Sequence, residues 1–201
     1  MSETRVPTQK RSIEKRNKII EKGFELMCEK GYHNTNTMQI AKYAGVSTGI
    51  VYQYFNDKEE IFLEGVKNYF DNLLNSLINY LEENKIELNN LDKLLNNMID
   101  LLIKSHNISK KAHNELTAMS HLNNKVDQYY KEQELNVTKE IVSILENNNI
   151  YIDNSFEKIH IIYGIVDNLC HEIIYHNHNE MNYDIMKKEV INLIIFIIKE
   201  Q

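Results

Sequence analysis

Hydrophobic residues recur with helical spacing along most of the chain. From Ile13 to Met27, and again from Ile61 to Leu81, apolar side chains are mostly three, four or seven positions apart. Residues at these spacings fall on one face of a helix. One proline and six glycines in 201 residues also favour long, uninterrupted helices. The pattern predicts an all-α protein.

About nine helices are expected, separated by turn-forming residues. Ser12 is the predicted N-cap of the first helix, Gly31 ends it, and Asp57 is the predicted N-cap of the fourth, which runs to about residue 84. The other predicted helices span residues 37–44, 48–55, 90–105, 109–121, 124–148, 154–177 and 183–199. Pairs and triplets of asparagine mark several of the breaks between them.

The segment from residue 37 to residue 55 has the layout of a helix-turn-helix. Gly45 accepts a positive φ without steric cost and ends one helix, and Ser47 is a suitable N-cap for the next. Apolar residues on both sides of the turn would hold the two helices at a steep angle: Ile40, Ala41, Val46, Val51 and Phe55. This arrangement is typical of DNA-binding proteins.

The second helix of this motif has two different faces. Val51 and Phe55 point toward the other helix, whereas Thr48, Gly49, Tyr52 and Gln53 spread over the opposite side. Hydroxyls and N-terminal N–H groups can bind phosphate, and glutamine can read an adenine edge. The alternative is an ordinary solvated amphipathic helix.

A wider set of residues around this motif resembles the N-terminal signature of the TetR family of bacterial transcriptional regulators. It comprises Gly31-Tyr32, Thr35, Thr37, Ile40-Ala41, Ala44-Gly45-Val46-Ser47, Gly49, Val51-Tyr52, Tyr54-Phe55, Lys58-Glu59 and Ile61-Phe62. The resemblance implies a three-helix DNA-binding domain, placed at 1–56, and a helical ligand-binding and dimerisation domain, placed at 57–201. The residues expected to bind DNA are Thr37, Ser47, Thr48, Gly49, Tyr52, Gln53, Tyr54 and Lys58. Met38 departs from the polar residue usual in the family.

Charge is unevenly distributed along the chain. The formal net charge is −6, but residues 1–58 hold ten Lys or Arg against six Asp or Glu. A basic N-terminal part on an acidic remainder confines attraction for phosphate to one end. Residues 1–11 are expected to be disordered, with Arg5, Lys10 and Arg11 forming an arm that reaches DNA, although a tail without function is equally consistent.

The last two predicted helices are apolar over much of their circumference, so each must be buried on more than one side. We expect homodimerisation through these helices, as the resemblance also implies; a thicker internal core is the alternative. A small-molecule effector of unknown identity is expected in the second domain. Its expected contacts mix aromatic, polarisable and polar groups, although core packing explains any one of them: Met98, Leu102, His106, His113, Met119, Tyr129 and Tyr163.

The histidines suggest a metal site. His160, Gly164, Asp167 and His171 lie near one helical face, and Tyr175 and His178 follow it. His106, His113 and His121 lie on neighbouring helices. The close two-histidine spacing of metal-binding helices is absent, and a polar patch at a dimer seam explains the face equally well. We therefore assign no metal ligand and no cofactor.

The expected function is a repressor that binds a palindromic operator as a dimer and is released by a small hydrophobic ligand. A regulator controlled by protein contact, or an architectural DNA-binding protein without an inducer, is the alternative. No catalytic motif points to an enzyme. Without a secretory signal, an apolar run of membrane-spanning length or a paired-cysteine motif, the chain is expected to be cytoplasmic, with Cys28 and Cys170 reduced.

Overall fold

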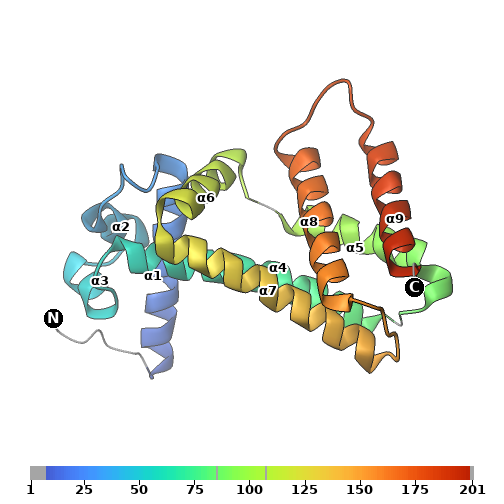
Figure 1. Cartoon of the computed structure of the whole chain (residues 1–201). Coiled ribbons are helices and arrows are strands. Elements are labelled where there is room, and N and C mark those ends of the chain that lie inside the picture. The colour runs from blue at the N-terminus through green and yellow to red at the C-terminus, as the bar shows by residue number, and fades with distance from the viewer. Residues whose placement is uncertain (1–7, 85, 107, 200–201) are drawn as a thin grey trace. The chain divides into compact units, whose positions relative to one another are not determined.

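The computed structural model describes residues 8–84, 86–106 and 108–199. Within these residues it contains nine α-helices, one short 3₁₀ helix and no strand (Figure 1). The helices are α1 Lys10–Lys30, α2 Thr37–Ala44, α3 Thr48–Tyr54, α4 Lys58–Glu83, η1 Leu88–Asn90, α5 Leu91–Ser105, α6 Lys110–Leu122, α7 Asn124–Asn147, α8 Ser155–Ile174 and α9 Tyr183–Lys199. The predicted all-α fold is confirmed. Among the described helices, none combines the length and hydropathy needed to cross a bilayer.

The beginning of α1 differs from the prediction. The N-cap is Gln9, and the backbone N–H of Ser12 donates to the Gln9 carbonyl at 2.8 Å, so Ser12 lies in the first turn of the helix. Lys10 and Arg11 are helical, and the prediction of a disordered arm is wrong for these two residues. Both have high helix propensity, which extends the helix past the serine. Arg5 lies outside the described residues.

The chain divides into two compact units. Met1–Phe70 and Ile108–Gln128 form the first, called here the head unit; Asp71–Asn107 and Tyr129–Gln201 form the second, called the body unit. The head unit therefore contains α1, α2, α3, α6 and the first half of α4. The functional boundary predicted at residue 56 stays a prediction.

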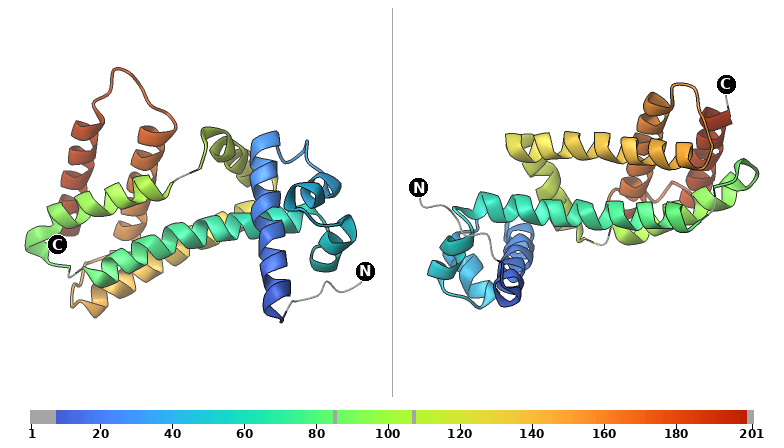
Figure 2. Two further views of the ribbon diagram at one scale, coloured as in Figure 1. Left: turned by 180° about the vertical axis from the view of Figure 1, so that it is seen from behind. Right: turned by 90° about the horizontal axis from the view of Figure 1, so that it is seen from below.

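The core of the head unit forms where α1 crosses the N-terminal part of α4 (Figure 2). Ile20 and Met27 of the predicted α1 stripe are buried, but Ile13 is 41% exposed and does not belong to the core. Two glycines allow the close approach of the helices. A Cβ on Gly23 would lie 2.6 Å from Ile61 Cγ2, and one on Gly65 would lie 2.4 Å from the Phe24 ring.

The body unit encloses one hydrophobic cluster. Helices α5, α8 and α9 pack against one another, and the second halves of α4 and α7 contribute Leu77 and Val137 to the same cluster. The turn after α8 is tied to the end of α5, because the buried Tyr175 hydroxyl donates to the backbone carbonyl of His106 at 3.0 Å. This bond fixes the backbone of His106 against α8.

The two cysteines are buried and belong to different units. Cys28 is 4% exposed in α1, and Cys170 is fully buried in α8. Burial raises the pKa of each thiol to about 12. Neither forms a disulfide, and since the thiolate is the reactive form, both are chemically sheltered in the folded chain.

Candidate nucleic-acid interface

The turn between α2 and α3 has the geometry that the sequence predicts. Gly45 adopts the left-handed conformation, with φ 69° and ψ 35°. The N–H of Gly45 donates to the Lys42 carbonyl at 3.2 Å, and the N–H of Val46 donates to the Ala41 carbonyl at 2.9 Å. These two bonds form a Schellman motif, which ends α2 sharply and directs the chain into α3.

Both helices of the motif have N-terminal caps. The Ser47 hydroxyl accepts a hydrogen bond from the Ile50 N–H at 3.4 Å, as predicted. Asn36 and Gln39 form a reciprocal capping box at α2, with bonds of 2.9 and 3.0 Å. This box was not predicted, although Asn followed three residues later by Gln is its sequence signature. The caps fix the residues at which α2 and α3 begin.

Helix α3 presents a polar face to solvent. Tyr52 is 52% exposed, Gly49 and Gln53 are exposed, and Thr48 is partly exposed. On the opposite side of the helix, Val51 is fully buried. The exposed groups are hydroxyls, an amide and bare backbone, which suit phosphate contact and base reading. The predicted division of the helix into two faces is thus present in the structure.

Two of the predicted DNA contacts are held inside the head unit. Tyr54 is only 8% exposed. The Lys58 ammonium donates to the carbonyls of Tyr32 at 2.6 Å and Thr35 at 2.8 Å, and it lies 4.3 Å from the centroid of the Tyr32 ring. Burial lowers the pKa of Lys58. Both side chains stabilise the fold here, and their contact with DNA stays a prediction.

The remaining predicted contacts lie around α2 and the turn. Thr37, in the first turn of α2, is partly exposed, and Ser47 is exposed although its hydroxyl also caps α3. Met38 is 66% exposed, so an apolar group occupies this part of the surface. Lys18 of α1 was not assigned to the site, yet its Nζ would lie 3.6 Å from a Cβ on Gly45. Sequence spacing gives no sign of this, since the contact joins α1 to the turn between α2 and α3.

Some basic side chains of the head unit are paired with carboxylates. Arg16 donates to Glu64 at 2.8 Å and its guanidinium lies 5.0 Å from the Phe55 ring centroid. Lys22 pairs with Glu25 at 2.7 Å. The positive charge counted along the sequence therefore overstates what the head unit can offer to phosphate.

The predicted effector contacts fall in both units. His113 and Met119 are buried on α6 in the head unit. The other five belong to the body unit: Met98, Leu102, His106, Tyr129 and Tyr163. Burial raises the pKa of Tyr163, so its hydroxyl remains protonated. Their role in binding an effector stays a prediction.

Comparison with known proteins gives the family. Residues 19–64 match the model of the bacterial regulatory proteins of the tetR family. These residues include both caps, the turn and all of α3. These residues carry the N-terminal domain of the TetR family. Curated relatives that the chain matches are named as regulators, in agreement with the expectation that it is not an enzyme.

Two of these relatives and one solved structure define the extent of the similarity. The chain is 47% identical over 58 residues to the HTH-type transcriptional regulator HbdR of Aromatoleum sp. (strain CIB), which covers 29% of this chain and 25% of that protein. It is 30% identical over 91 residues to the fatty acid metabolism regulator protein of Bacillus subtilis (strain 168), covering 45% of this chain and 47% of that protein. The matches thus span less than half the length of these relatives.

The fold extends further than the sequence match. A solved TetR-family transcriptional regulator from Mesorhizobium loti superposes with a TM-score of 0.67 at 21% identity, covering 95% of this chain and 96% of that one. At this identity the likeness concerns the fold alone. The fold of the helical body is therefore shared with that structure.

Proposed function

We propose that this protein is a transcriptional repressor that binds a palindromic operator as a homodimer and is released by a small hydrophobic ligand. The exposed polar face of α3 carries the proposal. It places Tyr52 and Gln53 in solvent on a helix whose other side, including Val51, is buried. A helix held in this way can enter the major groove without losing its own core.

The division of labour on α3 follows from side-chain chemistry. Tyr52 offers a hydroxyl and a ring, which suit the sugar-phosphate backbone and carry no base preference. Gln53 offers an amide that can pair with the N6 and N7 groups of adenine. Thr48 and the N-terminal N–H groups of α3 add phosphate contacts. Tyr52 therefore supports affinity and Gln53 supports specificity.

Dimerisation would supply the second α3 for the other half of a palindrome. The surface of α8 and α9 supports this proposal, because it exposes large apolar side chains. These are Ile161 at 54%, Ile185 at 59%, Leu193 at 44% and Phe196 at 60%. A second copy of the chain would cover them with the same face, which is the usual geometry of a two-fold contact.

Effector release requires that a ligand bind one state of the dimer better than the other. Fatty acids are suitable first probes, since one relative is named a fatty acid metabolism regulator. Ligand should weaken operator binding; tighter binding would refute the inducer-released form of the proposal.

The DNA-binding proposal is tested by selecting sequences from a randomised pool and measuring affinity by fluorescence anisotropy. Tyr52→Ala should weaken binding to every sequence, whereas Gln53→Ala should reduce the preference for the selected site by about 1–3 kcal/mol. Tyr151→Ala removes a still more exposed tyrosine from the body unit, 71% exposed, and should change neither. Equal losses on all sequences for both α3 variants would refute the division of labour.

A further inference from the structure

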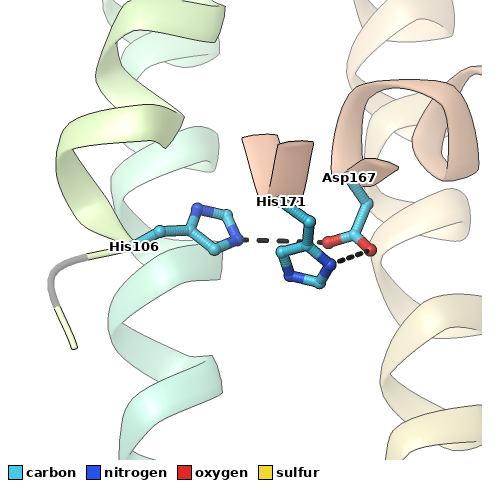
Figure 3. A group of neighbouring side chains, drawn as sticks. All are labelled: His106, Asp167 and His171. Atoms are coloured by element: carbon cyan, nitrogen blue, oxygen red, sulfur yellow. Dashed lines mark ion pairs between the residues drawn. The ribbon is translucent and has the colours of Figure 1, made fainter. Parts of the chain in front are cut away.

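Two histidines and an aspartate of the body unit lie close together. His106 is the C-cap residue of α5, while Asp167 and His171 lie one turn apart on α8 (Figure 3). One potential ligand atom from each lies within 4.8 Å of the other two. The sequence separates His106 from the others by about sixty residues, so only the fold brings them together.

The distances within this cluster are too long for ordinary hydrogen bonds. His106 Nε2 lies 4.0 Å from Asp167 Oδ1, and His171 Nδ1 lies 3.6 Å from Asp167 Oδ2. A direct charge-assisted bond would measure about 2.8 Å. Each imidazole therefore faces one oxygen of Asp167 without closing on it.

A hydrogen bond to the backbone of Leu102 determines the tautomer of the neutral His106 ring. Its Nδ1 lies 2.7 Å from the carbonyl oxygen of Leu102, which can only accept, so Nδ1 carries the hydrogen. In the neutral ring the lone pair is then on Nε2, the atom that faces Asp167. An N–H to carbonyl bond on the far side of the ring is the support that metal-binding histidines usually have.

The surroundings hold these groups in place. His106 is 8% exposed, and the Tyr175 hydroxyl bonds its backbone carbonyl. The rings of His106 and His171 are perpendicular, with centroids 5.6 Å apart. The donor set is thus largely preformed.

We propose that His106, Asp167 and His171 bind a divalent transition metal of the zinc class. Four ligands around zinc at bonds of about 2.0 Å lie about 3.3 Å apart, so the side chains need to close by about 1 Å or less on most pairs. Two imidazoles and one carboxylate suit zinc, cobalt or nickel and are a poor match for magnesium or calcium, which prefer oxygen.

Three protein ligands leave a fourth coordination position open. Water or a donor atom of an exogenous ligand would complete it. Since the metal would join the end of α5 to α8, it would stabilise one arrangement of the body unit by binding only the folded form. The site is independent of DNA binding and stands whether or not the repressor proposal holds.

The test is a calorimetric titration of the full chain with zinc chloride. The protein is first purified with a chelator, and the chelator is then removed. One zinc per chain should bind, and it should raise the melting temperature. Cobalt should give the visible absorption of a tetrahedral ion with nitrogen and oxygen ligands. Absence of saturable binding would overturn the proposal.

Variants assign the ligands. Asp167→Asn and His171→Ala alter partly exposed side chains, and each should weaken zinc binding more than about tenfold, the smallest loss typical even for outer-shell partners. The control is the double variant His176→Ala, His178→Ala, which removes two exposed histidines near Glu172 on the same part of the chain. Circular dichroism checks folding of each variant.

The zinc affinities of the ligand variants and of the control variant distinguish the proposed site from binding at the exposed histidines. Binding lost in the Asp167 and His171 variants but kept in the control supports the site. Binding lost only in the control would place zinc on the exposed histidines and refute it. If either ligand variant fails to fold, the other one and the cobalt spectrum of the unaltered chain decide.

Discussion

At the scale of single residues, glycine sets how closely the helices of the head unit approach. Gly65 of α4 faces Phe24 of α1, and the three side-chain atoms nearest to an added Cβ would lie 2.4 to 2.5 Å away. No side chain tolerates such a contact without movement of the ring or of the helix. The packing of α1 on α4 thus depends on the absence of one methyl group.

Gly65→Ala should therefore lower the free energy of unfolding by about 1–3 kcal/mol, despite the better helix propensity of alanine. Chemical denaturation checks this. Gly49→Ala is the matched control, because its added Cβ would meet only Ser47 Oγ at 4.0 Å, and it should be neutral or slightly stabilising. Equal stability of the two variants would show that Phe24 can move aside.

A second residue, Glu64, links stability to pH. Burial alone would raise the pKa of its carboxyl, but hydrogen bonds from Arg16 at 2.8 Å and Lys67 at 3.0 Å outweigh burial and hold the pKa below its ordinary value of 4.5. The ionised form is thus favoured by folding.

The contribution of Glu64 to stability should be complete above pH 4.5 and disappear as the pH falls through the lowered pKa of the folded state. The difference in unfolding free energy between the unaltered chain and Glu64→Gln should shrink over this acidic range. Denaturation at a series of pH values measures it. A difference that stays constant would show that the pairs contribute nothing through ionisation.

At the scale of elements, helix α6 is built into the head unit. Glu115 of α6 accepts a hydrogen bond from the backbone N–H of Tyr32 at 2.5 Å, directly after Gly31 ends α1. At the C-terminal end of α6, Asn123 donates to Glu59 of α4 at 2.6 Å. Residues far along the chain thus complete the loop that precedes the helix-turn-helix.

Glu115→Ala should destabilise the head unit by about 1–3 kcal/mol, because the Tyr32 N–H loses its acceptor in a partly buried place. Hydrogen exchange should be faster at Tyr32 and Thr35. Glu115→Gln keeps an acceptor and should recover most of the loss, and Glu140→Ala, on an exposed part of α7, should have no effect. Unchanged exchange in Glu115→Ala would argue against this coupling.

The sequence predicted helix ends well where a capping or turn residue determines them. Helix α2 spans the predicted residues because Gly45 adopts the left-handed conformation that the turn requires. Ser12 misled the prediction of α1, since a serine in the first turn looks like a cap in sequence. The attachment of α6 to the head unit could not be predicted, because helical periodicity shows which face of a helix is apolar but not which helix packs against that face.

The α3 surface and the cluster of His106, Asp167 and His171 also differ in how far the sequence predicts them. The α3 surface is contiguous in sequence, and its exposed face followed from helical spacing. The cluster of His106, Asp167 and His171 depends on the packing of α5 against α8. Its i,i+4 pair on α8 joins an aspartate to a histidine, whereas the usual metal-binding pattern has two histidines at this spacing. Helical spacing placed Asp167 and His171 on one face, but long-range packing determines that His106 joins them, so the sequence did not predict the cluster.

At the scale of the whole molecule, the proposed dimer depends on apolar area exposed on α8 and α9. Phe196 is 60% exposed and Ile185 is 59% exposed on α9. Burying two such side chains in each subunit would contribute several kcal/mol to association, at about 25 cal/mol per Å². This surface is the expected centre of the contact.

Phe196→Glu should shift the protein toward the monomer, with a dissociation constant raised by at least about tenfold, because it buries a charge in an apolar contact. Sedimentation velocity over a concentration series measures this. Leu122→Glu, at a position 72% exposed on α6, is the matched control and should leave the association unchanged. A dimer that survives Phe196→Glu would require a different face.

The burial of both thiols has a practical consequence for observing this protein at work. Because Cys28 and Cys170 are shielded, one in each unit, a cysteine introduced at an exposed position such as Tyr151 would be the reactive one under native conditions. A single spectroscopic label could then be attached without replacing either native cysteine. In a dimer, two such labels would report the distance between subunits before and after zinc, fatty acid or operator is added.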